Sequence, residues 1–125
     1  MVNVMISIHP KYVENMKSGK KRTEVRKSYI AALPTHGYIH FYIYETRPVC
    51  KVIGDFLCDD VYSMVFNDDS TCLTDEEFNE YKGNKKHVYG YEIYKLKFYD
   101  KPKELAEFGL KRAPQSWCYI RKDIK

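Results

Sequence analysis

Apolar and polar residues alternate over several short stretches of the chain, and this alternation predicts β-strands. In one stretch Ile39, Phe41 and Ile43 share a face, whereas tyrosines and His40 occupy the opposite face. The stretches are joined by turns rather than by regular βαβ units, which favours mixed or antiparallel pairing. The predicted strands lie at about residues 4–8, 20–28, 37–45, 49–58, 87–99 and 116–120.

Two segments carry the signals of short helices. Pro10 suits the first turn of a helix, and apolar residues follow it at helical spacing, which predicts a helix at about 10–18. Thr74 and Glu77 form the sequence pattern of a capping box, which predicts a second helix at about 75–82. With one or two further helical turns near the C-terminus, the expected fold class is α+β: a small barrel of about six strands with two or three short helices.

The composition is typical of a single compact domain over residues 1–125. The chain is 44% hydrophobic and 30% charged, and no apolar run is long enough to span a membrane. No signal-peptide pattern precedes the first strand, so we expect a cytoplasmic protein without a membrane partner. The four cysteines show no zinc-ligand spacing, so we expect reduced thiols, no metal and no cofactor.

The charges are distributed unevenly along the chain. The net charge is +4, but residues 54–81 contain nine acidic residues and no lysine or arginine. Both flanking segments are therefore basic. Two basic flanks suit a polyanionic partner such as nucleic acid, although solvated lysine-rich surfaces would give the same pattern.

A row of charged residues occupies the predicted strand at 20–28. In a strand, Arg22, Glu24 and Arg26 share one face, and Thr23 and Val25 share the other. Such a row forms either an exposed face with weak ion pairs or the floor of a cleft.

Two parts of the chain together resemble the ASCH domain, a branch of the PUA-like superfamily. Residues 7–12 and 19–27 are similar to the family's first helix and its Gly-x-Lys-x-x-Glu-x-Arg pattern. Residues 89–102 and 112–120, the latter reading Arg-Ala-Pro-Gln-Ser-Trp-Cys-Tyr-Ile, are similar to later landmarks of the family. The resemblance covers nearly the whole chain except a variable acidic connection at about 55–85.

This resemblance implies a PUA-like β-barrel with a basic cleft beside the first helix that binds RNA, another nucleic acid or a nucleotide. An arginine in the cleft could hold a phosphate, and aromatic residues near the C-terminus could stack on an unpaired base. Each residue also has a structural alternative as a salt-bridge partner, helix cap or core residue. The candidate binding residues are His9, Lys20, Lys21, Arg22, Glu24, Arg26, Lys27, Arg112, Gln115, Ser116, Trp117 and Tyr119.

Two alternatives remain open. Some small members of the family hydrolyse N4-acylated cytidine with a Lys–Thr–Glu set; Lys21 matches that lysine, but Glu24 stands where the resemblance implies the threonine. Thr23 points to the other face of the strand, and Glu92 is a candidate for the acid. An enzyme acting on a modified nucleoside or on RNA would therefore use Lys21 and Glu24. The other alternative is a protein-interaction module that docks through the acidic segment 54–81.

Overall fold

The computed structural model describes residues 2–31 and 37–121, and within them the chain forms eight strands, two α-helices and two 3₁₀ helices. One sheet has five strands in the order β7-β4-β3-β1-β8. Its β1–β3 pair is parallel, and its other pairs are antiparallel. The bounds are β1 Val2–Ile8, β3 Ile39–Glu45, β4 Lys51–Cys58, β7 Tyr94–Lys103 and β8 Trp117–Tyr119.

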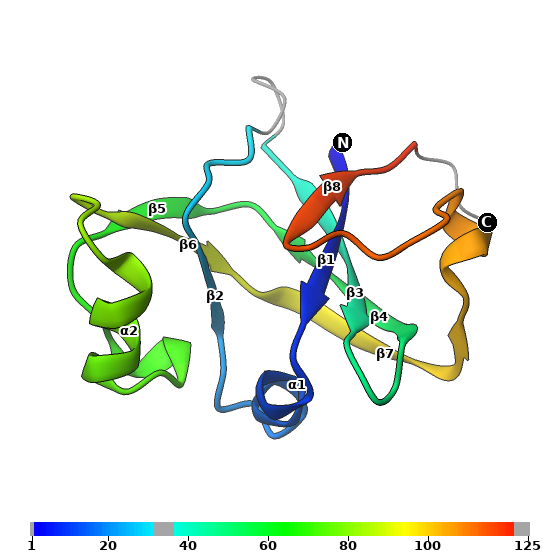
Figure 1. Cartoon of the computed structure of the whole chain (residues 1–125), viewed down its shortest axis with the longest axis horizontal. Coiled ribbons are helices and arrows are strands. Elements are labelled where there is room, and N and C mark those ends of the chain that lie inside the picture. Colours follow the sequence, from blue (N-terminus) through cyan, green and yellow to red (C-terminus); the bar gives the residue numbers. More distant parts are fainter. Residues whose placement is uncertain (1, 32–36, 122–125) are drawn as a thin grey trace.

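The second sheet has three antiparallel strands in the order β2-β6-β5. Figure 1 shows this sheet and α2 at one end of the molecule, with α1 beside the lower ends of β1 and β2. The remaining bounds are α1 Pro10–Lys17, β2 Thr23–Arg26, β5 Val61–Met64, η1 Asp69–Thr71, α2 Asp75–Lys82, β6 Val88–Glu92 and η2 Leu105–Phe108. These elements confirm the predicted α+β class with mixed pairing, with eight strands in place of about six.

Hydrophobic side chains cover both faces of β3. Ile39, Phe41 and Ile43 are fully buried in the main core cluster, as their alternation predicts. Tyr42 and Tyr44 point to the other face and pack in a second cluster with Phe108 of η2. The central strands are therefore buried on both sides, which fixes their register because a shift of one residue would exchange the two faces.

Local sequence signals set the starts of both α-helices. His9 is the N-cap of α1, and its Nδ1 accepts a hydrogen bond from the backbone N–H of Lys11 at 3.1 Å. At α2 the Thr74 hydroxyl accepts from the Glu77 N–H, and the Glu77 carboxylate accepts from the Thr74 N–H. This arrangement confirms the predicted capping box.

One predicted strand is wrong. The stretch 87–99 divides at Ile93 into β6, which pairs with β2 and β5, and β7, which pairs with β4. The chain changes sheet at Ile93, and Lys95, with a positive φ of 52°, lies just inside β7 at an irregularity of the β4–β7 pairing. Alternation alone does not reveal this change of sheet, because both halves have a strand-like pattern. The short strand β5 is also absent from the prediction.

No helix within residues 2–31 and 37–121 is both long and apolar enough to cross a membrane. The four cysteines all fall within these ranges and are free thiols. The same ranges contain no group of three or more metal-ligating side chains of the histidine, cysteine or acidic types.

Candidate functional site

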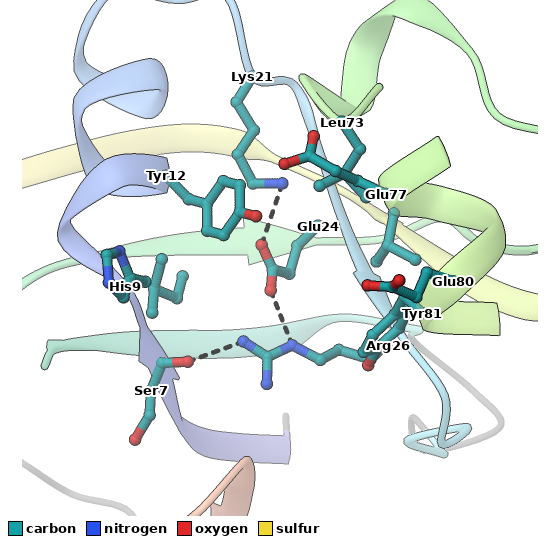
Figure 2. Close-up of a pocket in the computed structure, with 12 residues that line it drawn as sticks. Ser7, His9, Tyr12, Lys21, Glu24, Arg26, Leu73, Glu77, Glu80 and Tyr81 are labelled. Carbon is teal, nitrogen blue, oxygen red and sulfur yellow. Dashed lines mark hydrogen bonds and ion pairs between the residues drawn. The ribbon is translucent and has the colours of Figure 1, made fainter. Parts of the chain in front are cut away.

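A pocket of about 530 Å³ lies between α1, β2 and α2. Figure 2 shows Tyr12 of α1 on one side, Glu77, Glu80 and Tyr81 of α2 on the other, and Glu24 between them. Its volume falls within the range of small-molecule sites in proteins. The lining residues are Ser7, Ile8, His9, Tyr12, Lys21, Glu24, Val25, Arg26, Leu73, Glu77, Glu80 and Tyr81.

Lys21 is buried at the edge of this pocket, where only 4% of the residue is exposed. Its ammonium group donates to the carbonyl oxygens of Thr23 at 2.9 Å and Thr71 at 3.2 Å. It also lies 3.3 Å from the Glu24 carboxylate. An ammonium has three N–H donors, and these three acceptors match them. Lys21 therefore joins β2 to the end of η1.

Arg26 connects the two sheets. Its Nε donates to Glu24 at 2.7 Å, and one terminal nitrogen donates to the Ser7 carbonyl oxygen of β1 at 2.8 Å. The other terminal nitrogen donates to the Ser116 hydroxyl, just before β8, at 2.8 Å. Most donors of the guanidinium are therefore occupied by the protein. Arg26 therefore ties β2 to the five-stranded sheet, and its predicted contact with a phosphate stays a prediction.

Glu24 forms the floor of the pocket as a fixed carboxylate. Burial raises its pKa, but the charges and hydrogen bonds of Lys21 and Arg26 act against burial and leave the pKa below its usual value. Only 5% of Glu24 is exposed, and its carboxylate lies between Lys21 and Arg26 in the lining of the pocket. Glu24 is therefore ionised near neutral pH and acts as a hydrogen-bond acceptor at a fixed position.

The wall formed by α2 was missed in the sequence analysis. Glu77, Glu80 and Tyr81 recur at helical spacing and share one face of α2. Glu77 also forms an exposed ion pair with Lys11 of α1 at 3.2 Å, which joins the two helices beside the pocket. The spacing on α2 could have been recognised in the sequence, but nothing local shows that this face meets β2 and α1.

The lining is richer in acidic than in basic groups. Glu24, Glu77 and Glu80 contribute three carboxylates, and Lys21 and Arg26 contribute two cations. The prediction of a basic cleft is therefore wrong for this pocket. The two carboxylates from α2 offset the two cations, and Glu24 of β2 adds a third carboxylate, because the acidic segment folds against the basic strand.

The structure brings together four of the predicted site residues, His9, Lys21, Glu24 and Arg26, and leaves the others outside the lining. Ser116 lies behind the lining, where its hydroxyl accepts from Arg26 and its carbonyl oxygen accepts from the backbone N–H of Ser7 at 3.0 Å. Trp117 is half-buried against the main core. Tyr119 is exposed, and its ring packs edge-on against the Trp117 ring with 5.1 Å between the ring centroids. The predicted residues outside the lining are Lys20, Arg22, Lys27, Arg112, Gln115, Ser116, Trp117 and Tyr119.

The predicted faces of β2 are correct for Thr23, Glu24 and Arg26, whereas Val25 also lines the pocket, against the prediction. Glu24 and Arg26 face the pocket together, whereas the Thr23 hydroxyl bonds to the hydroxyls of Tyr62 and Ser70 at 3.0 and 2.7 Å. Arg22 precedes the strand and has an exposed side chain, so its predicted place in the charged row is wrong. Thr23 is therefore held away from the pocket by its own hydrogen bonds.

The fold is that of an ASCH domain. The chain superposes on ASCH from Zymomonas mobilis with a TM-score of 0.79 and 23% identity, covering 97% of this chain and 89% of that chain. A serine-to-alanine variant of the same protein gives a TM-score of 0.80 at 21% identity, covering 96% of this chain and 89% of the other. A tyrosine-to-phenylalanine variant gives a TM-score of 0.77 at 22% identity, covering 96% of this chain and 91% of the other. These likenesses confirm the fold suggested by the resemblance.

Comparisons of sequence alone give less information about this protein than the structural comparisons do. No family model matches the chain. Among curated proteins it is 28% identical over 125 residues to ATP synthase subunit alpha from Ureaplasma parvum serovar 3, covering 94% of this chain. The chain spans only 15% of that relative's length. The match therefore concerns a small part of that protein.

Proposed function

We propose that this protein binds nucleic acid and receives one unpaired base, chiefly of single-stranded or structured RNA, in the pocket between α1, β2 and α2. The observation that carries the proposal is the fixed Glu24 carboxylate at the floor of a pocket of about 530 Å³, with Tyr12 and Tyr81 among its walls. Single-stranded RNA is commonly recognised by bases that leave the stack, contact aromatic side chains and form hydrogen bonds along their polar edges. The ASCH fold is consistent with this role.

The geometry favours a base over a phosphate inside the pocket. A phosphate needs donors or free cations, but Lys21 and Arg26 direct most of theirs to protein acceptors. The carboxylates of Glu77 and Glu80 would also repel it. The phosphates of a bound strand would therefore lie outside, near exposed cations such as Lys27, whose ammonium lies 4.9 Å from the centre of the Tyr81 ring.

The same contacts support binding rather than amide hydrolysis. A lysine that acts as a base or nucleophile must present its amine nitrogen to the substrate, but the Lys21 nitrogen is directed to three protein acceptors. Glu24 has a lowered pKa, which makes it a weak general base near neutral pH. Glu92, the candidate acid, is exposed and does not line the pocket.

The test is a titration of labelled single-stranded RNA, hairpin RNA and duplex DNA by fluorescence anisotropy at two salt concentrations. We compare wild type with Tyr12→Ala, and with Tyr94→Ala as the matched control, because Tyr94 is exposed and lies outside the lining. Loss of a stacking ring should weaken single-stranded RNA binding by roughly 5- to 150-fold, and the control should bind as wild type does. Thermal unfolding of each variant checks that it is folded.

Absence of binding to any of the three polymers at low salt would contradict the proposal. Equal affinities for wild type and a folded Tyr12→Ala variant would place the binding site elsewhere on the surface. Higher salt should weaken binding, because phosphate contacts release counterions. Replacing the exposed Lys27 by alanine should lower the slope of log affinity against log salt by about one if it contacts one phosphate.

A further inference from the structure

The pocket presents mainly hydrogen-bond acceptors to a ligand. Each Glu24 oxygen already accepts from one cation: Oε1 lies 3.3 Å from the Lys21 ammonium, and Oε2 lies 2.7 Å from Arg26 Nε. A carboxylate oxygen can accept two hydrogen bonds, so one further position remains on each oxygen. Glu77 and Glu80 add carboxylates on the α2 side. A ligand with two neighbouring donors would therefore satisfy Glu24 best.

Among the four standard RNA bases, guanine has this donor pattern. Its N1–H and exocyclic N2–H lie side by side and point the same way, as do the paired donors of an arginine that binds a carboxylate through two parallel hydrogen bonds. Adenine and cytosine place one amino donor beside an unprotonated ring nitrogen. Uracil places one N–H between two carbonyl oxygens. An acceptor facing the carboxylate would be left without a partner and would be repelled.

The contacts with Lys21 and Arg26 fix the Glu24 carboxylate before a ligand with two neighbouring donors binds. The two cations fix both oxygens before a ligand arrives, so little ordering of the side chain remains to be done on binding. Tyr12 and Tyr81 enter the pocket from different helices, on the two sides of Glu24 in Figure 2. A flat base whose donor edge points to Glu24 would lie between these two walls.

We propose that the pocket selects guanine, with N1–H and N2–H donating to the two oxygens of Glu24. This inference rests on the proposed function, because it names the base that the pocket receives. It assigns Glu24 as the residue that determines specificity. Tyr12 and Tyr81 supply contact area that any base could use.

The decisive experiment changes the ligand and leaves the protein intact. We titrate wild-type protein with short single-stranded RNAs that differ at one position of an otherwise constant sequence. That position carries guanosine, inosine, 1-methylguanosine, adenosine, cytidine or uridine. Inosine lacks only the 2-amino group, so it should bind about tenfold or more weakly than guanosine. 1-Methylguanosine replaces the N1–H by a methyl group and should lose the preference entirely.

A protein variant gives a second measurement. Glu24→Gln presents one acceptor and one donor, and should lose the discrimination between guanosine and inosine while adenosine or cytidine gains in relative affinity. Glu76→Gln is the matched control, because Glu76 is exposed on α2 outside the lining and should keep the preference. If Glu24→Gln does not fold because Lys21 and Arg26 lose their partner, the analogue series alone decides.

The outcomes separate the two proposals. Tight RNA binding with the same affinity for guanosine, inosine and the other bases would overturn guanine selection and leave nucleic-acid binding in place. If no RNA binds, nucleic-acid binding fails, and free guanosine and inosine are then compared by NMR shifts of the tyrosine ring signals. Shifts with guanosine and none with inosine would support guanine selection, whereas none with either would overturn it.

Discussion

Removal of the Lys21 ammonium should destabilise the protein more than removal of any exposed lysine. The residue is 4% exposed, and its ammonium donates to the carbonyl oxygens of Thr23 and Thr71 and pairs with Glu24. Lys21→Ala leaves these acceptors without that donor, and Glu24 keeps only the Arg26 cation. Loss of one partner from a buried ion pair costs about 3–5 kcal/mol.

The lower end of that range is the expected value, because the pocket beside Glu24 lets water replace part of the lost interaction. The free energy of unfolding should therefore fall by about 3 kcal/mol. For a domain of this size, about 3 kcal/mol corresponds to a decrease of roughly 12 °C in the melting temperature. Lys21→Met keeps most of the apolar stem, so it should show most of the same loss.

The assay is urea unfolding followed by circular dichroism, with thermal unfolding as a second readout. Lys20→Ala is the matched control, because it removes an exposed lysine from the adjacent position. Its effect should stay within about 0.5 kcal/mol. A loss below about 1 kcal/mol for Lys21→Ala would refute the reasoning, since that is the range of surface ion pairs.

Three further predictions concern packing, thiol reactivity and acid stability. Gly54→Ala would place a Cβ in steric conflict with the Lys97 carbonyl oxygen, so urea unfolding should show a loss of about 3 kcal/mol. A neutral effect would contradict this packing. Burial raises the pKa of Cys58 to about 11, so iodoacetamide at pH 8 should label the exposed Cys50 before Cys58. Mass spectrometry that shows equal labelling of the two thiols in the native protein would refute this. The lowered pKa of Glu24 means that its contribution to stability is complete above its ordinary value of 4.5 and is lost as pH falls through the folded-state value. Urea unfolding at a series of pH values should show this decline for wild type, and its absence below pH 4.5 would contradict the assigned ion pairs.

Several local features followed from the sequence because their causes lie within a few residues. The Thr74–Glu77 capping box and the start of α1 at Pro10 depend on neighbouring backbone groups. The alternation of Ile39 with Phe41 identified the buried face of β3, because side chains in a strand alternate between its faces. The fold itself was identified through a resemblance spread over much of the chain, and the structural comparisons confirm it.

The candidate site shows the opposite case. Sequence spacing placed Glu24 and Arg26 on one face of β2, but gave no sign that Arg26 would use its donors on Ser7 and Ser116. Those partners are far from Arg26 along the chain, so only the packing of the two sheets brings them together. The structure therefore gives Arg26 a structural role that the sequence did not indicate, and its role in binding stays a prediction.

The charge of the pocket was also decided by tertiary structure. The sequence by itself determined that a basic segment precedes an acidic one, and that Glu77, Glu80 and Tyr81 share a face of the helix at 75–82. It did not determine that this face would pack beside β2. A pocket's electrostatic character depends on which charges are neighbours in space, because Coulomb interactions act over distances between atoms and not over positions along the chain. Folding therefore turned a basic strand and an acidic helix into one acceptor-rich pocket.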